Sequence, residues 1–213
     1  MEPLLVTKTY ALPPVNLSEV WRYAGVTTPD DALSALLEEC LLEAEPQLAP
    51  KVCYGEFPFS CEGDNLCFGF ATVASADLKQ ALQGCQKVIL FGATIGIGMD
   101  RLIAKYGSLS PTKALLFQAL GAERIEALCD CFCKEFALSR RFSPGYGDLP
   151  LSFQKDLFRV LDCSRKIGLT LNDSLLMSPS KSVTAIAGTT DEGCVTSPCD
   201  RCNKKDCSFR RNL

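Results

Sequence analysis

The sequence predicts one domain that mixes α-helices with β-strands, followed by a small cysteine-rich tail. Of the 213 residues, 47% are hydrophobic, which is enough to bury a sizeable core and excludes general disorder. Helix-like and strand-like segments alternate along most of the chain. After Gly188 the composition turns to Thr, Asp, Lys, Arg and Cys with almost no aliphatic residues. We therefore expect a domain over residues 1–188 and a tail over residues 189–213.

The first predicted helix follows a strong start signal. Thr28 supplies a capping hydroxyl, Pro29 suits the first turn, and Asp30 and Asp31 add acidic side chains at the N-terminus. Apolar residues then recur at helical spacing. We expect this amphipathic helix to end near Pro46.

A strand, a helix and a second strand are predicted next. Residues 66–73 have the β-branched and aromatic composition of a strand. Ser75 then starts a short helix that Gly84 closes. The apolar residues 88–91 indicate a second, buried strand.

The middle of the chain is predicted to be mostly helical. A helix over residues 97–106 is expected to stop at Gly107. Ser110-Pro111 opens a long helical pattern that runs to about Leu138. Residues 139–150 are rich in Ser, Arg, Pro and Gly, which indicates an ordered loop.

The last part of the domain returns to regular structure. Residues 152–166 have helical spacing, and β-like segments follow at 169–171 and 182–187. We find no internal repeat in the sequence.

Charge and residue types exclude several classes of function. Lys plus Arg number 22 and Asp plus Glu 25, a net charge of −3, so the chain has no basic surplus with which to bind a nucleic acid. The chain has no histidine, which excludes Ser-His and Cys-His nucleophile pairs and histidine-ligated metals. If the protein takes part in chemistry, we expect the reactive centre to lie on a bound cofactor.

The N-terminus indicates a reducing compartment, and this determines how the cysteines are interpreted. The first residues contain neither a basic stretch nor a long apolar run, so we predict no secretory signal and expect a cytoplasmic protein. The longest uncharged apolar stretch, residues 88–99, is too short to span a bilayer, and we expect no membrane partner. Most of the 13 cysteines are therefore expected to be small buried hydrophobes rather than disulfides. This expectation covers Cys40, Cys53, Cys85 and Cys163.

A glycine-rich segment lies between the second strand and the next helix. It reads Gly92-Ala93-Thr94-Ile95-Gly96-Ile97-Gly98. Glycines in this setting can let a backbone approach a phosphate. Their spacing fits neither a dinucleotide fingerprint nor a P-loop, so we favour a structural strand-to-helix turn.

A second candidate site is the loop Arg141-Phe142-Ser143-Pro144-Gly145-Tyr146-Gly147-Asp148-Leu149-Pro150. The guanidinium of Arg141 could hold a ligand carboxylate through paired hydrogen bonds, and Tyr146 could contact an adjacent ring or cation. A generic surface loop rich in turn residues is the alternative interpretation.

Three motifs give the sequence a family resemblance. In chain order they are Ala93-Thr94-Ile95-Gly96 with Asp100-Arg101-Leu102-Ile103, then Arg141 to Tyr146, and then Met177-Ser178-Pro179 with Ser182-Val183. Over residues 85–188 the sequence resembles the activation domain of cobalamin-dependent methionine synthase, which also occurs as a free-standing protein.

The resemblance implies an α+β fold: a C-shaped domain with helices packed around a twisted antiparallel sheet. It also implies that S-adenosylmethionine binds on the concave face and donates a methyl group to cob(II)alamin. The cobalamin would be held by a partner, either methionine synthase or a related corrinoid methyltransferase. An electron donor such as flavodoxin or ferredoxin would supply the electron. The protein would thus be a component of a methyltransferase reaction that serves methionine biosynthesis.

The resemblance also assigns the binding residues by position. Arg141 would grip the carboxylate of the methyl donor, and the backbone at Ser143 would meet its adenine. Gly145 and Tyr146 would line the pocket, and Glu126 matches an acid of the family that lines the same site.

The tail contains a possible metal site. Cys194, Cys199, Cys202 and Cys207 lie within fourteen residues, with a Cys-x-x-Cys at the centre. Four thiolates so spaced can bind zinc or an iron–sulfur cluster, and free or redox-active thiols are the third interpretation. Ligation could supply the folding free energy that so polar a segment lacks.

Three more cysteines fall on the long predicted helix. Cys129, Cys131 and Cys133 are spaced at i, i+2 and i+4, so only the first and the third share a face. We therefore expect them to pack in the core rather than to bind one metal.

Two classes of function remain open. The first is a stand-alone reactivation protein that binds S-adenosylmethionine and supports reductive methylation of a corrinoid protein. The second is an iron–sulfur or zinc module for electron transfer or interaction that has lost methyl-donor binding.

Overall fold

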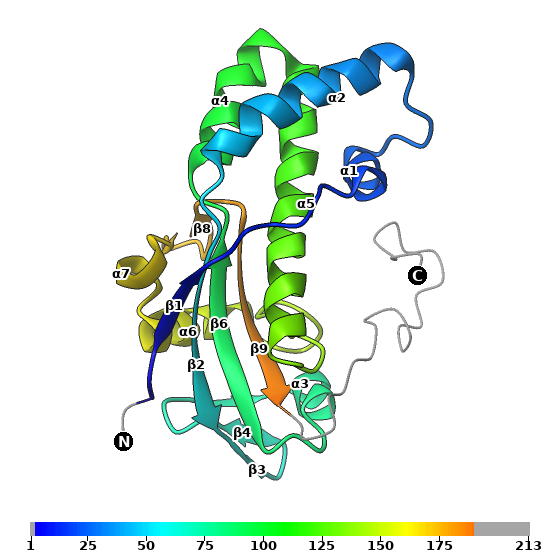
Figure 1. Cartoon of the computed structure of the whole chain (residues 1–213). Helices are drawn as coiled ribbons and strands as arrows, with labels where there is room; N and C mark the ends of the chain where they lie inside the picture. Colours follow the sequence, from blue (N-terminus) through cyan, green and yellow to red (C-terminus); the bar gives the residue numbers. More distant parts are fainter. Residues whose placement is uncertain (1–2, 190–213) are drawn as a thin grey trace.

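The computed structural model describes residues 3–189, and its framework is a four-stranded sheet of order β1-β2-β6-β9 (Figure 1). All three strand pairs are antiparallel, so the sheet type implied by the resemblance is confirmed. The strands are β1 (Val6–Thr9), β2 (Lys51–Pro58), β6 (Lys87–Thr94) and β9 (Ser182–Thr189).

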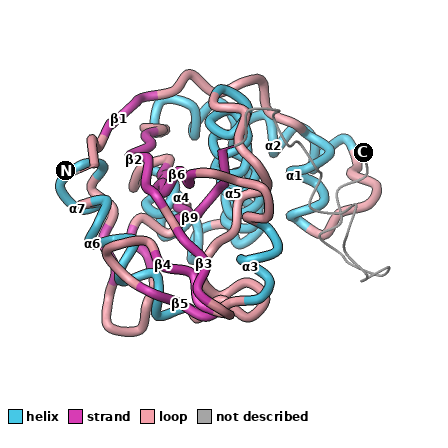
Figure 2. Tube along the Cα trace, turned by 90° about the horizontal axis from the view of Figure 1, so that it is seen from below, coloured by secondary structure: helices cyan, strands magenta, loops and turns pink. Residues whose placement is uncertain are grey.

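Two smaller sheets extend this framework. The first joins β3 (Ser60–Glu62), β4 (Asn65–Cys67) and β5 (Thr72–Ala74), and the second joins β7 (Thr170–Leu171) to β8 (Met177–Ser178). Figure 2, in which the molecule is seen from below, shows β3, β4 and β5 next to one another on one side of the molecule.

Seven α-helices surround the strands in the described part of the chain. They are α1 (Leu17–Ala24), α2 (Asp31–Ala44), α3 (Ala76–Ala81), α4 (Gly98–Leu109), α5 (Pro111–Glu135), α6 (Gln154–Leu161) and α7 (Cys163–Ile167). Single 3₁₀ turns cover Glu45–Gln47 and Leu151–Phe153. No helix within residues 3–189 combines the length and the apolar composition that crossing a membrane requires.

Strand β6 is the centre of the core because both of its faces are buried. Ile89, Phe91 and Ala93 belong to one apolar cluster, whereas Val88 and Leu90 belong to another. The first cluster includes buried residues of α1, α2, α4 and α5, and the second includes residues of α3, α6, α7 and the β3–β5 sheet. The alternation of side chains along one strand therefore divides the core into two layers.

The long helix α5 covers one face of the sheet. It begins where predicted, with the Ser110 hydroxyl accepting a hydrogen bond from the Lys113 amide and Pro111 in the first turn. Near its other end, the ring of Phe132 packs on Phe91 of β6 and Tyr54 of β2, with ring centroids 4.7 and 5.1 Å apart. Figure 1 shows α5 running beside β6 and β9.

Buried polar contacts tie the N-terminal segment to α5. The Arg124 guanidinium donates hydrogen bonds to the carbonyls of Pro13 and Pro14, at 2.7 and 3.3 Å. The amide of Asn16 donates to Glu123, 3.1 Å away, and Glu123 also forms an ion pair with Arg124. Both charges are almost fully buried, so these bonds offset the cost of removing them from water.

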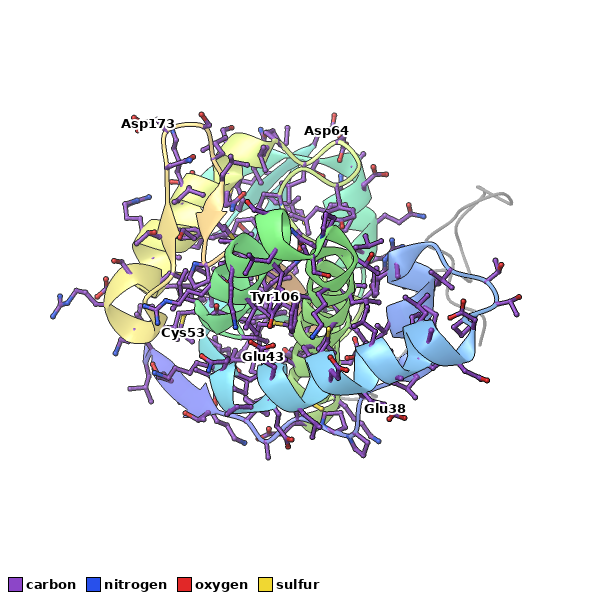
Figure 3. All side chains as sticks on the ribbon, turned by 90° about the horizontal axis from the view of Figure 1, so that it is seen from above. Glu38, Glu43, Cys53, Asp64, Tyr106 and Asp173 are labelled. Atoms are coloured by element: carbon purple, nitrogen blue, oxygen red, sulfur yellow. The ribbon has the colours of Figure 1, made fainter. Side chains whose placement is uncertain are left out.

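At the end of the molecule formed by α2 and α4, a polar contact joins the two helices. The carboxylate of Glu43 accepts hydrogen bonds from the Lys105 ammonium and the Tyr106 hydroxyl, both at 2.7 Å. These bonds hold the pKa of Glu43 below its ordinary value. Figure 3 labels Glu43 and Tyr106 side by side.

Three of the four cysteines named above are buried as expected, namely Cys40, Cys53 and Cys163. Cys85 is only half-buried. The sulfur atoms of Cys53 and Cys163 lie 3.9 Å apart beneath Gly92.

Two predicted helix signals are corrected by the structure. The cap of α2 is Asp30, whose carboxylate accepts from the Leu33 amide at 2.7 Å, and not Thr28. Helix α4 runs through Gly107 to Leu109, because that glycine lies in an open helical position rather than in a left-handed one.

Two predicted elements are each broken in two. The strand expected at 66–73 is the hairpin of β4 and β5, which turns at Gly69 with a φ of +78°. The helix expected at 152–166 is α6 followed by α7, because Asp162 adopts a φ of +49° between them.

The glycine-rich segment forms the predicted strand-to-helix turn. Gly96 has a φ of +87°, which suits glycine, and lies against Ala49. A Cβ atom on Gly98 would lie 2.3 Å from the carbonyl oxygen of Gln47. These glycines allow two backbone segments to approach each other.

The two glycines of α4 are expected to respond to alanine in opposite ways. Gly98→Ala should lower the free energy of unfolding by about 1–3 kcal/mol, because the new methyl group would collide with the Gln47 backbone. Gly107→Ala should raise it by about 0.5–1 kcal/mol, because nothing lies within 4 Å and alanine favours the helix. Urea unfolding of both variants measures the difference, and equal stabilities would contradict the close contact at Gly98.

Candidate functional site

The candidate site forms where the chain leaves α5 and passes along the open edge of β9. The amide and carbonyl of Phe142 pair with the carbonyl and amide of Ile186, both at 2.8 Å, and the Ser139 amide donates to Gly188. The same register would place Pro144 opposite Thr184, and proline has no N–H to donate. The pairing therefore stops and the chain turns away into the loop.

Arg141 anchors the start of this loop to α5. Its guanidinium forms ion pairs with Glu126 at 2.5 Å and with Asp130 at 2.6 Å. These acids lie four residues apart and so share one face of the helix. The exposed fractions of the three side chains are 20% for Arg141, 32% for Glu126 and 46% for Asp130. The cluster thus reaches the surface and combines two carboxylates with one guanidinium.

Two cysteine thiols of α5 lie near this ion-pair cluster. Burial raises the pKa of the Cys129 thiol, and the positive charge of Arg141 opposes that shift. Burial also raises the pKa of Cys133, which is within hydrogen-bonding reach of Arg141. Cys129 packs in the core, as predicted from the helical spacing. Both groups therefore remain thiols at neutral pH.

The rest of the loop is a compact turn that exposes one aromatic side chain. The Tyr146 amide donates to the Ser143 carbonyl at 3.1 Å, and the Gly145 amide donates to the Leu149 carbonyl at 2.9 Å. Gly145 and Gly147 both have positive φ, +89° and +54°. The Tyr146 ring stands 68% exposed between them, whereas Ser143 is half-buried.

The structure therefore brings the predicted site residues into one region. Glu126 and Arg141 are in direct contact. Ser143, Gly145 and Tyr146 are joined through the turn that follows Arg141.

Sequence reasoning missed two acids of this region. Asp130 could have been found, because it lies one helical turn beyond Glu126. Asp148 lies in the predicted loop, but nothing in the sequence indicated its contacts, because the residues that it contacts are more than seventy positions away in the chain.

Asp148 attaches the end of the loop to the first turn of α3. Its carboxylate accepts hydrogen bonds from the Ser75 hydroxyl and from the amides of Ala76 and Asp77, the amides at 2.7 and 3.3 Å. The Ser75 hydroxyl and then these amides lower the pKa of Asp148. In return, the Asp148 amide donates to the Asp77 carboxylate at 3.2 Å.

The predicted metal ligands Cys194, Cys199, Cys202 and Cys207 lie outside the described residues. Within residues 3–189, no group of three or more His, Cys, Asp or Glu side chains is arranged to hold a metal ion.

Comparison with known proteins bears on the fold. The chain matches no protein-family model, and no curated protein matches it. Among solved structures, it is similar to the crystal structure of the MetH reactivation domain bound to AdoHcy, with a TM-score of 0.62. The similarity covers 86% of this chain and 78% of that one, at 14% sequence identity. The α+β fold that the sequence motifs implied is thereby confirmed, and this chain shares its fold with the MetH reactivation domain.

Proposed function

We propose that this protein binds S-adenosylmethionine at the loop that begins with Arg141 and supports reductive methylation of cob(II)alamin on a separate corrinoid protein. The observation that carries the proposal is the fold shared, over 86% of the chain, with a domain that was solved with AdoHcy bound. AdoHcy is what remains of S-adenosylmethionine after its methyl group has been transferred. The Arg141-x-x-Pro144-Gly145-Tyr146 motif supports the same ligand.

The charges of the candidate site suit this ligand. S-adenosylmethionine carries a carboxylate, an ammonium and a sulfonium group, so it offers two cations and one anion. The site offers the complementary set, two carboxylates and one guanidinium. A guanidinium has five N–H donors, and the two ion pairs use two of them, so Arg141 retains donors for the ligand carboxylate.

The other residues would position the ligand rather than react with it. In this proposal the backbone at Ser143 meets the adenine, and Gly145 and Tyr146 line the pocket. When bound, the sulfonium of S-adenosylmethionine supplies an activated methyl group, so the transfer requires no histidine from this chain.

The proposed partners follow from the same chemistry. A corrinoid methyltransferase such as methionine synthase would hold the cobalamin. An electron donor such as flavodoxin or ferredoxin would reduce it, and we place the reaction in the cytoplasm. The contact with the corrinoid protein would be transient, because the protein must cover the corrinoid face and displace whatever else occupies it.

A second proposal concerns the predicted tail of residues 189–213, whose first residue, Thr189, is the last residue of β9 in the structure. The spacing of Cys194, Cys199, Cys202 and Cys207 favours a zinc or iron–sulfur site. In this alternative the protein is an electron-transfer or interaction module and does not bind the methyl donor.

Replacing Arg141 by lysine tests the methyl-donor site. Lysine keeps a positive charge between Glu126 and Asp130 but loses the planar fork, so affinity for S-adenosylmethionine should fall about 10- to 100-fold. Isothermal titration calorimetry measures this affinity. Arg159→Lys is the matched control, because that arginine pairs with Asp156 on α6 and is mostly exposed. Unchanged affinity in Arg141→Lys would show that Arg141 does not bind the ligand. A wild-type protein that does not bind S-adenosylmethionine would contradict the proposed function.

The proposed reductive methylation of cob(II)alamin can be followed by visible spectroscopy. The full chain, mixed with a cob(II)alamin-loaded corrinoid protein, a reductant and S-adenosylmethionine, should accelerate formation of methylcobalamin. Arg141→Lys should slow the reaction, and omission of the reductant should stop it. If no corrinoid protein that is tested is methylated faster with the chain than without it, the reactivation role is wrong.

Metal analysis of the full chain tests the second proposal. An iron–sulfur cluster should give a brown, anaerobically purified protein whose colour bleaches on reduction, and zinc should give a colourless protein with about one equivalent bound. Replacing Cys199 and Cys202 by serine should abolish metal retention. Where the wild-type chain binds S-adenosylmethionine, the same variant should bind it with unchanged affinity. A chain that retains neither metal contradicts both versions of the tail site.

A further inference from the structure

We infer that Asp148 is a positioning residue, whose attachment to α3 holds the loop of residues 143–149 in the shape that presents Tyr146 to a ligand. The inference rests on the proposed function for the identity of the ligand, S-adenosylmethionine. We call the contacts among Ser75, Asp77 and Asp148 the loop clamp.

The loop clamp is reciprocal, which distinguishes it from a simple helix cap. The Asp148 carboxylate accepts from the Ser75 hydroxyl and from two amides of α3, and the Asp148 amide donates back to Asp77. Helix α3 has a cap of its own, because the Ser75 hydroxyl also accepts from the Leu78 amide at 3.0 Å. The additional bonds from Asp148 therefore serve to fix the loop.

Glycine at position 147 is required for this contact. Its φ of +54° is unfavourable for other residues, and a Cβ atom there would lie 2.2 Å from the Asp77 carboxylate. The Asp77 carboxylate can reach the Asp148 amide only because Gly147, the residue before Asp148, has no side chain. Both residues are thus needed for the contact with Asp77, because Gly147 leaves room for the Asp77 carboxylate and Asp148 donates its amide to it.

The loop is anchored at both of its ends, and Tyr146 lies between the two anchors. The first anchor consists of the ion pairs of Arg141 and the pairing of Phe142 with β9, followed by the buried Pro144, and the second is the loop clamp. Only Gly145, Tyr146 and Gly147 separate Pro144 from Asp148. Two of these three residues are glycines with positive φ, so the ordering of Tyr146 depends on both anchors holding.

The carboxylate of Asp148 is suited to this role at neutral pH. The Ser75 hydroxyl and the amides of Ala76 and Asp77 donate hydrogen bonds to it and stabilise its charged form. These bonds outweigh the effect of burial, so the pKa of Asp148 is lower than that of an ordinary aspartate. The group therefore accepts hydrogen bonds as an anion, which strengthens them.

Two measurements on full-length variants test the role of Asp148. Hydrogen exchange without ligand follows the amides of Gly145, Tyr146 and Leu149, which are bonded within the turn. Calorimetry follows S-adenosylmethionine affinity. Asp148→Ala should speed exchange of these amides about 10-fold or more and weaken binding about 10-fold. Asp148→Asn, which keeps one acceptor oxygen, should restore part of both effects.

Gly147→Ala disrupts the loop clamp without changing Asp148, because its methyl group would displace the Asp77 carboxylate. It should also speed amide exchange and weaken S-adenosylmethionine binding. This second variant keeps the test valid if Asp148→Ala does not fold. Asp173→Ala is the control, because Asp173 is an exposed aspartate in the turn between β7 and β8 (Figure 3). It should leave exchange and affinity unchanged.

The outcomes separate this inference from the proposed function. Unchanged exchange in both Asp148→Ala and Gly147→Ala overturns the loop clamp, whether or not the protein binds the ligand. Faster exchange with unaltered affinity overturns the positioning role alone. A wild-type protein that does not bind S-adenosylmethionine overturns the proposed function and with it the positioning role, even where exchange shows that the loop clamp exists.

Discussion

The two-sided burial of β6 is the constraint on which the rest of the structure depends. A strand with apolar side chains on both faces requires cover on both, and here α5 covers one face while α6 and α7 cover the other. The chain must therefore cross from one face of the sheet to the other after α5. It does so around the edge of β9, and residues 139–150 are that crossing. The candidate site is thus a consequence of how the core is closed.

The crossing segment is held at three points, each by a different kind of interaction. Arg141 is fixed by charge to α5, Phe142 by backbone pairing to β9, and Asp148 by hydrogen bonds to α3. Since α5 and β9 belong to the rigid core, the start of the loop is rigid too. The end of the loop is held by the contacts of Asp148 with α3 and by the side chain of Leu149, which is buried in the core.

Much of the fold could be predicted from local sequence signals. The start of α5 at Ser110-Pro111, the buried strand β6 and the turn-rich loop after α5 each depend on residues within a few positions of one another. The antiparallel sheet was predicted only from the resemblance of short motifs to a known family, because no local sequence pattern indicated it. Elements without strong signals, such as β1 and α1, were not predicted, because tertiary packing and the contacts of Arg124 hold them in place.

The candidate site could be predicted only in part, for a physical reason. Glu126 and Arg141 belong to recognisable motifs, and their ion pair confirms that they meet. Whether a carboxylate such as Asp148 touches a helix more than seventy residues away depends on the completed fold. The break at Asp162 was missed likewise, because a positive φ in a non-glycine residue has no reliable sequence signal.

The buried contacts of Arg124 and Glu123 have a consequence for the order in which the protein folds. They join Pro13, Pro14 and Asn16 to residues 107 to 111 positions further along the chain, so each closes a loop of more than one hundred residues. Such closure costs more conformational entropy than the local pairing of β3 with β4 or the packing of α4 on α5. The local units are therefore expected to form first. We expect the segment that contains Pro13, Pro14 and Asn16 to dock onto α5 after these local units have formed.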